Sequence, residues 1–365
     1  MIAVDKLAVT LEQACHDAGI ASVDLDSLRR SRYGRNDNLH GVLIDGTGIF
    51  IKIFDDTPEA RRRQARSTAA DRAVPNESNV SPRLLAWADA PPLLMFEDVE
   101  GSDLMTVPDA DGWSAADAAV VADCAAVLAR LHAVPIDDTE YEEHSLPPVR
   151  ALGAIPAEVY VAVSAAELHA WRILQTDTEL AAELRRIAAR DRAQTRSFIH
   201  GDVRLDQFLQ RSSGEVVLLD WEEFRVGDPA RDVGALVGDV LHRSLLRIVR
   251  PTSRFHEEFA HAEVLRRGGE VLEDARPVLV ELWEKYQNGN PVDADFTARA
   301  TKFAGWHLFD RLLASAHRSV RLPPIALACA GIGRNALLRT DAFSSVIHPQ
   351  RVPIVAIATP KVEAQ

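Results

Sequence analysis

The segment from residue 198 to residue 232 constrains the fold most, because it places chemically capable side chains at the ends of two short apolar runs. The first run ends in His-Gly-Asp202, and Gln207 follows five residues after that aspartate. The second run, beyond a short turn, ends in Asp220. In phosphoryl transfer one carboxylate orients the acceptor hydroxyl, while an amide and a second carboxylate hold the metal ion on the phosphates. The pattern predicts Asp202 in the first role and Gln207 with Asp220 in the second.

These motifs resemble those of the aminoglycoside phosphotransferases and choline kinases, a branch of the protein-kinase-like fold. The resemblance rests on His-Gly-Asp202, the amide at the fifth position after it, Leu-Leu-Asp220-Trp-Glu and the continuation Gly-Asp-Pro-Ala-Arg-Asp232-Val-Gly. Two motifs at the expected separation, each after a predicted strand, make the signal fairly specific. The resemblance implies an α+β, bilobal fold with a small β-rich N-lobe and a larger helical C-lobe. The family has Asn where this chain has Gln207, whose side chain is longer by a methylene group.

Length and composition predict two lobes or two domains and argue against several classes of partner. A chain of 365 residues exceeds the usual size of a single hydrophobic core. The three cysteines are scattered without metal-ligand spacing, which is typical of reduced thiols in a cytoplasmic protein. No apolar run is long enough for a transmembrane helix, and no signal peptide is visible, so no membrane partner is expected. A net charge of −13 without a basic stripe argues against nucleic-acid binding.

We expect the N-lobe to span residues 1–96 and a hinge at residues 97–101 to lead into the C-lobe of residues 102–345, with a tail at 346–365. The N-lobe should contain an N-terminal helix, an antiparallel sheet and one further helix. A glycine-containing turn predicts a hairpin of two strands within residues 43–54. Periodicity and capping residues predict helices at 57–74, 114–132, 164–192, 229–249, 257–286 and 295–321.

Lys52 stands between two isoleucines in the second predicted strand of that hairpin. One interpretation is a lysine on the solvent face of an amphipathic strand, but the motifs downstream favour the strand lysine with which kinases bind the nucleotide phosphates. Such a lysine needs a carboxylate partner on the following helix. Glu59 at the helix start is explained by the helix dipole alone. Asp71 lies deeper in the helix and is the candidate partner, with a surface pair to a neighbouring arginine as the equal alternative.

The remaining nucleotide contacts are predicted from position in the chain. Residues 33–38 stand where a loop would cover the phosphates, but they include one glycine only and cannot form a glycine-lined cradle. We therefore expect Arg35 and Asn36 to contribute side-chain contacts, with a plain polar turn as the alternative. The hinge backbone at Glu97 and Val99 is expected to hydrogen-bond the adenine. The predicted cofactors are ATP, or GTP, and Mg²⁺.

Several further charged residues lie near the two motifs. Arg204 is a candidate for balancing phosphate charge from the catalytic loop. Glu222 or Glu223 would bind a second metal ion or a basic part of the substrate, and a structural salt bridge is the equal alternative for all three. Asp232 lies in a mostly apolar predicted helix, where an unpaired charge is costly. We expect it to bind the catalytic-loop backbone or His200.

A narrower resemblance covers most of the chain, from about residue 34 to residue 339. Its segments are Gly34-Arg-Asn-Asp, the run from Asp220-Trp-Glu-Glu to Asp-Val-Gly-Ala, Phe303-Ala-Gly-Trp-His-Leu-Phe-Asp-Arg-Leu and Gly331-Ile-Gly-Arg. Together they are similar to the kinase subunit of class V lanthipeptide synthetases and of related thioamitide pathways. The resemblance implies phosphorylation of Ser and Thr in a ribosomal precursor peptide. It also implies a separate lyase subunit, which eliminates phosphate to leave dehydroalanine or dehydrobutyrine.

Two other functions are compatible with the motifs. A small-molecule antibiotic kinase, of the aminoglycoside or macrolide type, would share the lobes and catalytic residues but have an enclosed acidic acceptor pocket instead of an open peptide groove. A non-catalytic kinase-like scaffold would explain Gln207 and the glycine-poor loop, although Lys52, Asp202 and Asp220 together argue against it. In either kinase, the helices within residues 164–192 are expected to flank the acceptor site.

Overall fold

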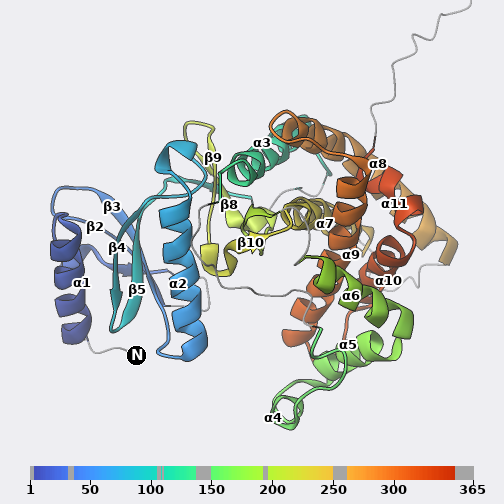
Figure 1. Cartoon of the computed structure of the whole chain (residues 1–365), viewed down its shortest axis with the longest axis horizontal. Helices are drawn as coiled ribbons and strands as arrows, with labels where there is room; N and C mark the ends of the chain where they lie inside the picture. The colour runs from blue at the N-terminus through green and yellow to red at the C-terminus, as the bar shows by residue number, and fades with distance from the viewer. Residues whose placement is uncertain are drawn as a thin grey trace, which may run out of the picture.

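A computed structural model describes residues 4–31, 37–104, 108, 111–136, 149–191, 196–249 and 261–349 of the chain. A β-sheet dominates the N-terminal part, and helices make up most of the C-terminal part (Figure 1). The expected α+β architecture is therefore confirmed. Most of the predicted tail lies outside the described residues.

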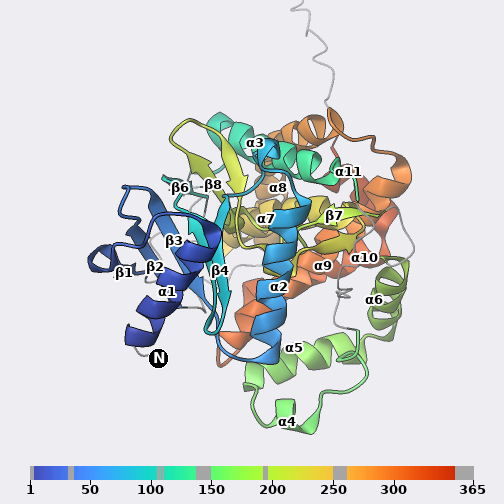
Figure 2. The ribbon, with the colours of Figure 1, turned by 60° about the vertical axis from the view of Figure 1, so that its left-hand side comes forward.

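The N-terminal sheet has five antiparallel strands in the order β1-β2-β3-β5-β4. They are β1 (Arg29–Arg30), β2 (Asp37–Val42), β3 (Gly48–Ile53), β4 (Leu84–Asp89) and β5 (Pro92–Glu97). Ile49, Ile51 and Ile53 of β3 are buried with apolar residues of α1 (Val4–Ala18), which lies against this face (Figure 2). Because side chains alternate along a strand, Lys52 is presented on the opposite face, the side of α2 (Pro58–Ala73).

The predicted hairpin exists, but its first strand lies earlier than expected. Residues 48–53 form β3, whereas β2 ends at Val42 and residues 43–47 make the turn. Within the turn the Leu43 N–H donates to the Thr47 carbonyl (2.8 Å), and Gly46 adopts a left-handed φ of 89°. Leu43 is buried and bridges to Val23, so its apolar character reflects core packing and not membership of the strand.

Five short strands organise the catalytic segment. They are β6 (Gly101–Asp103), β7 (Ser197–Ile199), β8 (Phe208–Arg211), β9 (Val216–Leu218) and β10 (Arg225–Gly227). The β8–β9 hairpin is extended by β6 on the other edge of β8, and β7 pairs with β10. A side chain at Gly101 would stand 2.3 Å from the Gln210 carbonyl oxygen, so glycine is required where the chain leaves β5 and joins this hairpin.

Nine helices of the described residues lie above and to the right of these strands, on the side away from the N-terminal sheet (Figure 1). They are α3 (Ala115–His132), α4 (Ala157–Tyr160), α5 (Ala165–Thr176), α6 (Thr178–Asp191), α7 (Ala230–Leu246), α8 (His261–Gln287), α9 (Ala294–His317), α10 (Pro324–Leu338) and α11 (Thr340–Ile347). Ser114 caps α3 in a reciprocal capping box with Asp117, as its position at the start of the predicted helix suggested. Within the described ranges, no helix is both long and apolar enough to span a bilayer.

Helix α7 lies in the middle of the helical part and is buried on almost every side. Gly234 and Gly238, one turn apart, face α9. A Cβ at these positions would lie 2.4 Å from the Ala300 carbonyl oxygen and 2.7 Å from the His307 Cβ, so the two helix backbones approach closely only because both residues are glycine. This tight contact fixes α7 and the acidic residues that it presents to the catalytic loop.

Candidate active site

The loop after β7 is anchored by a carboxylate from α7. Asp232 is fully buried and accepts hydrogen bonds from the backbone N–H groups of His200 (2.7 Å) and Gly201 (3.0 Å). Nε2 of His132 lies 3.2 Å from the same carboxylate. Burial would raise the pKa of Asp232, but the hydrogen bonds and the nearby imidazoles outweigh it and hold that pKa below its usual range. The predicted contact of Asp232 with the catalytic-loop backbone is confirmed.

The histidine and glycine of the first motif have structural roles in this loop. His200 Nε2 donates to the Leu219 carbonyl (2.8 Å), and its Nδ1 accepts the Asp202 N–H (3.3 Å). Gly201 has a φ of 85°, and a Cβ there would stand 2.5 Å from the Glu223 carbonyl oxygen. The loop therefore needs glycine at this position, and His200 ties it to the strand end that carries Asp220.

Asp202 lies at the surface of the loop, with 41% of its side chain exposed. Its carboxylate accepts from Arg204 Nη1 (3.0 Å), and Arg204 Nε donates to Asp206 (2.8 Å). Partial burial raises the pKa of Asp202 above its ordinary value, although Arg204 acts in the opposite direction. A carboxylate with a raised pKa takes up a proton more readily, which suits the role predicted for it.

The β8–β9 hairpin brings the two predicted metal-binding positions together. The Leu219 N–H donates to the Gln207 carbonyl (2.7 Å), so Asp220 follows directly beside the end of the short helix η3 (Leu205–Gln207). Asp220 has a left-handed φ of 63°, a strained backbone conformation that is frequent at functional sites. Among the described residues, no group of three His, Cys, Asp or Glu side chains is arranged to hold a metal ion. One carboxylate and one amide oxygen fit Mg²⁺, which keeps water and phosphate oxygens as its other ligands.

Lys52 reaches across from β3 to this position. Its ammonium lies 2.5 Å from Asp220 Oδ1 and also contacts the Glu222 carboxylate. Burial would lower the pKa of Lys52, but the two carboxylates raise it above the ordinary value. Burial would likewise raise the pKa of Asp220, and Lys52 more than offsets that effect. The pair therefore stays charged and places a cation beside the predicted metal carboxylate.

The expected pair between Lys52 and Asp71 is not formed. Asp71 instead accepts the backbone N–H of Leu84 (3.3 Å), near the end of α2. The acidic partner comes from the short helix η4 (Trp221–Glu223), directly after Asp220. Helix α2 faces this segment with arginines: Arg63 pairs with the Glu222 carboxylate (3.3 Å), and Arg66 donates to its carbonyl (2.5 Å). Arg63 and Arg66 are three residues apart and so lie on one face of α2, which was the sequence signal that this face contacts an acidic segment.

The structure also shows the contacts of three charged residues whose roles the sequence left open, namely Glu222, Glu223 and Arg204. Glu222 is paired with Lys52 and Arg63, and Glu223 lies 3.5 Å from Arg66 Nη2, so both take part in structural salt bridges. Arg204 bridges two acids of its own loop.

The nucleotide contacts predicted outside this centre are not tested by the structure. Arg35 and Asn36 lie outside the described residues. The Glu97 N–H donates to the Arg83 carbonyl (2.9 Å) within the sheet, so this group is already used. Hydrogen bonding of adenine by the Glu97 carbonyl and the Val99 backbone stays a prediction.

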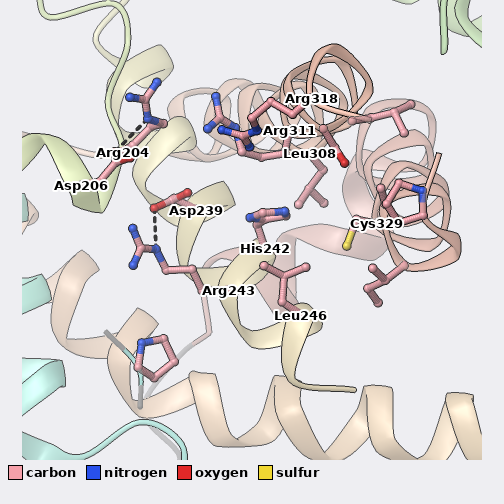
Figure 3. A pocket seen from close by; sticks show the side chains of 16 residues that line it. Arg204, Asp206, Asp239, His242, Arg243, Leu246, Leu308, Arg311, Arg318 and Cys329 are labelled. Carbon is pink, nitrogen blue, oxygen red and sulfur yellow. Dashed lines mark hydrogen bonds and ion pairs between the residues drawn. The ribbon is translucent and has the colours of Figure 1, made fainter. Parts of the chain in front are cut away.

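A pocket of about 610 Å³ adjoins the catalytic loop (Figure 3). Arg204 and Asp206 lie at one end, and α7, α9 and α10 supply most of the remaining lining. The helices within residues 164–192, which were expected to flank the acceptor site, contribute no residue to this pocket. These helices pack instead against other parts of the helical region, α5 against α9 and α6 against α10.

Comparisons with known proteins agree with this geometry. The model of the phosphotransferase enzyme family matches residues 50–276, which is more than half of the chain. The chain therefore belongs to that family. Among curated protein sequences, none matches it.

Solved structures show the same fold at low sequence identity. A putative fructosamine-3-kinase from Thermobifida fusca has a TM-score of 0.51 and 15% identity, over 92% of this chain and all (100%) of the other. A microcompartment-associated aminopropanol kinase has a TM-score of 0.51 and 14% identity, over 94% of this chain and 98% of the other. An amicoumacin kinase in complex with AMP-PNP, Ca²⁺ and Ami has a TM-score of 0.51 and 12% identity, over 86% of this chain and 89% of the other. The fold is that of protein-kinase-like phosphotransferases.

The metal role of Gln207 can be tested by its magnesium requirement. Removing the amide in Gln207→Ala takes away one of two predicted protein ligands, so we expect the Mg²⁺ concentration for half-maximal phosphoryl transfer to rise about 10-fold or more. Gln210→Ala, on the neighbouring β8 strand, is the matched control and should leave the requirement unchanged. An unaltered magnesium titration for Gln207→Ala would remove Gln207 from the metal site.

Proposed function

We propose that this phosphotransferase transfers the γ-phosphoryl group of ATP to serine and threonine hydroxyls of a ribosomally made precursor peptide. A separate lyase subunit then eliminates the phosphate and leaves dehydroamino acids. The observation that carries the phosphoryl-transfer part is the meeting of Lys52, Asp220 and the Gln207 backbone at one end of the β8–β9 hairpin, with His200 tying the Asp202 loop to the same hairpin.

The protein's own residues divide the work of the reaction. Asp202 accepts a hydrogen bond from the acceptor hydroxyl and takes its proton as the bond to phosphorus forms. Lys52 neutralises phosphate charge once the nucleotide competes for its ammonium. Gln207 and Asp220 would hold Mg²⁺, which adds charge neutralisation at the phosphates when bound.

The peptide acceptor is supported by where the narrower resemblance falls. Two of its segments lie in α9 and α10, the helices that line the pocket beside the catalytic loop. Gly305 of α9 and Gly333 of α10 face one another so closely that a Cβ on either would lie within 2.7 Å of the other's carbonyl oxygen. Leu308, Arg311 and Leu312 of the α9 segment line the pocket that also contains Arg204, and the α10 segment packs against α9 behind them.

The charge of this pocket argues against an aminoglycoside acceptor. Polycationic sugars require carboxylates to bind, whereas the arginines of this pocket outnumber its aspartates. The intact set of Lys52, Asp202 and Asp220 argues against a scaffold without turnover.

Product masses test the proposal. The purified chain is incubated with Mg-ATP and, separately, with a Ser/Thr-rich precursor peptide and with a panel of aminoglycosides and macrolides. We expect a phosphorylated peptide, which becomes a dehydrated peptide on addition of the lyase. A phosphorylated antibiotic with an untouched peptide would replace this proposal by antibiotic resistance. No product with any acceptor, together with no binding of Mg-ATP, would indicate a scaffold.

A further inference from the structure

Two helices present one face each to the pocket beside the catalytic loop. Helix α7 contributes Asp239, His242, Arg243 and Leu246, and α9 with its C-cap contributes Leu308, Arg311, Leu312, Ser315 and Arg318. The spacings of three, four and seven residues place each set on a single helix face. Figure 3 shows the labelled residues of both helices around the same space, with Arg204 and Asp206 at one end.

The acids of this pocket are already neutralised by partners within the protein. Asp239 accepts from the Leu205 N–H (3.0 Å) and from Arg243 Nε (3.0 Å), and it lies 3.2 Å from His307 Nε2. These contacts outweigh the effect of burial and hold the pKa of Asp239 far below its usual range. Asp206 is engaged by Arg204. Neither carboxylate is therefore available to bind a cationic acceptor.

The two arginines at the C-terminal end of α9 still have hydrogen-bond donors or charge that no carboxylate among the described residues uses. Arg311 donates to Asp310 (2.5 Å), but its buried Nε has no hydrogen-bond partner. Arg318 is exposed, and within the described part of the chain no carboxylate lies within ion-pair distance of it. Burial lowers the pKa of the neighbouring His242 to about 4, so this imidazole is neutral at pH 7 and offers a hydrogen bond without a charge.

Two further acids near the catalytic loop, Asp202 and Asp310, do not make the pocket acidic, because each is paired with an arginine. Asp202 is held by Arg204, and Asp310 by Arg311. Leu246, Leu308 and other apolar side chains complete the wall. The pocket thus combines an apolar surface with guanidinium groups, and guanidinium binds carboxylate or phosphate oxygens through two parallel hydrogen bonds.

We propose that this pocket binds an anionic group of the acceptor, with Arg311 and Arg318 as its specificity-determining residues. On the proposed peptide-kinase function, on which this inference rests, that group is the side-chain carboxylate of a Glu or Asp close to the phosphorylated residue. The enzyme then selects serine and threonine by acidic neighbours in the peptide.

A peptide series measures this selection directly. Each peptide carries one serine and a single Glu placed within about five residues on either side, the reach of an extended chain across the pocket, and a matched peptide carries Gln at the same place. With the full chain and Mg-ATP, we expect kcat/KM to be about 10-fold higher or more for Glu than for Gln at one or two positions. Arg318→Glu should abolish that preference and favour Lys at the same position.

Arg321→Glu is the control, because it makes the same charge change three residues further along and does not line the pocket. It should keep the wild-type preference. Arg318→Lys, which retains the charge but not the forked geometry, should keep part of it. Equal rates for the Glu and Gln peptides at every position would overturn the inference while leaving peptide phosphorylation in place.

A second acceptor series separates this inference from the proposed function. It compares sugar phosphates and hydroxy acids with choline and aminoglycosides. Turnover of the anionic compounds, with none of the peptides, would retain the anionic pocket and reject the peptide kinase. A preference for the cationic compounds, or no transfer to any anionic acceptor in either series, would reject the pocket assignment.

Discussion

Asp202→Asn is expected to lower phosphoryl transfer by about 10³-fold or more, because the amide cannot accept the proton of the acceptor hydroxyl. Binding of Mg-ATP should stay close to wild type, since the nucleotide contacts are assigned to other residues. The loop should remain folded, because Asp232 and not Asp202 anchors its backbone. Single-turnover phosphorylation of the acceptor and calorimetric titration with nucleotide measure the two effects separately.

Asp123→Asn is the matched control for that variant. This substitution makes the same change of charge on the surface of α3, where Asp123 pairs with Lys285 (3.2 Å). We expect full activity from it. Transfer by Asp202→Asn at a rate near that of wild type would show that another group accepts the proton.

Asp232→Asn is expected to destabilise the protein by about 3 kcal/mol or more, because it leaves two buried backbone N–H groups and an imidazole without their charged acceptor. The asparagine oxygen can replace only one of the two carboxylate oxygens, so its NH₂ group faces a donor that the other oxygen accepted. Denaturant unfolding monitored by tryptophan fluorescence gives the change in midpoint. An unchanged midpoint, relative to wild type and Asp123→Asn, would contradict the anchoring role.

The same residue predicts a dependence of stability on pH. The pKa of Asp232 is lower in the folded protein than in the unfolded chain. Its stabilising contribution is therefore complete above the unfolded pKa of about 4 and is lost as the pH falls through the folded pKa. The difference in unfolding free energy between wild type and Asp232→Asn should shrink over that acidic range.

The catalytic segment was predictable because its chemistry is local in sequence. Gln207 directly precedes β8 and Asp220 follows β9, and a tight turn joins these two paired strands, so the spacing alone brings the two residues together. The need of a buried carboxylate for a partner was enough to connect Asp232 to the catalytic loop. Lys52 was recognisable as a candidate because a charged side chain between apolar residues of a strand is costly unless it has a partner or a function.

The partner of Lys52 was not predictable in the same way. Choosing Asp71 assumed that α2 points an acid at β3, but the rotation of a helix about its axis depends on packing that sequence spacing does not reveal. The structure turns Arg63 and Arg66 toward the site instead, and Glu222 becomes the acid.

The acceptor pocket also depends on tertiary packing. The spacing of Asp239, His242 and Arg243 on one helix, and of Arg311 and Arg318 on another, is visible in the sequence. That the two faces meet follows from the close contact of α7 with α9 at Gly234 and Gly238, which brings together residues far apart in the chain.

The central claim is that Lys52, Gln207 and Asp220 form a site for a metal-bound nucleotide. Calorimetric titration of ATP into the full chain, with and without Mg²⁺, tests it most directly, with Asp220→Asn measured in parallel and its folding checked by thermal unfolding. The account predicts ATP binding that Mg²⁺ strengthens in wild type and no longer strengthens in Asp220→Asn. Binding that is absent, or that responds to Mg²⁺ equally in both proteins, would contradict it.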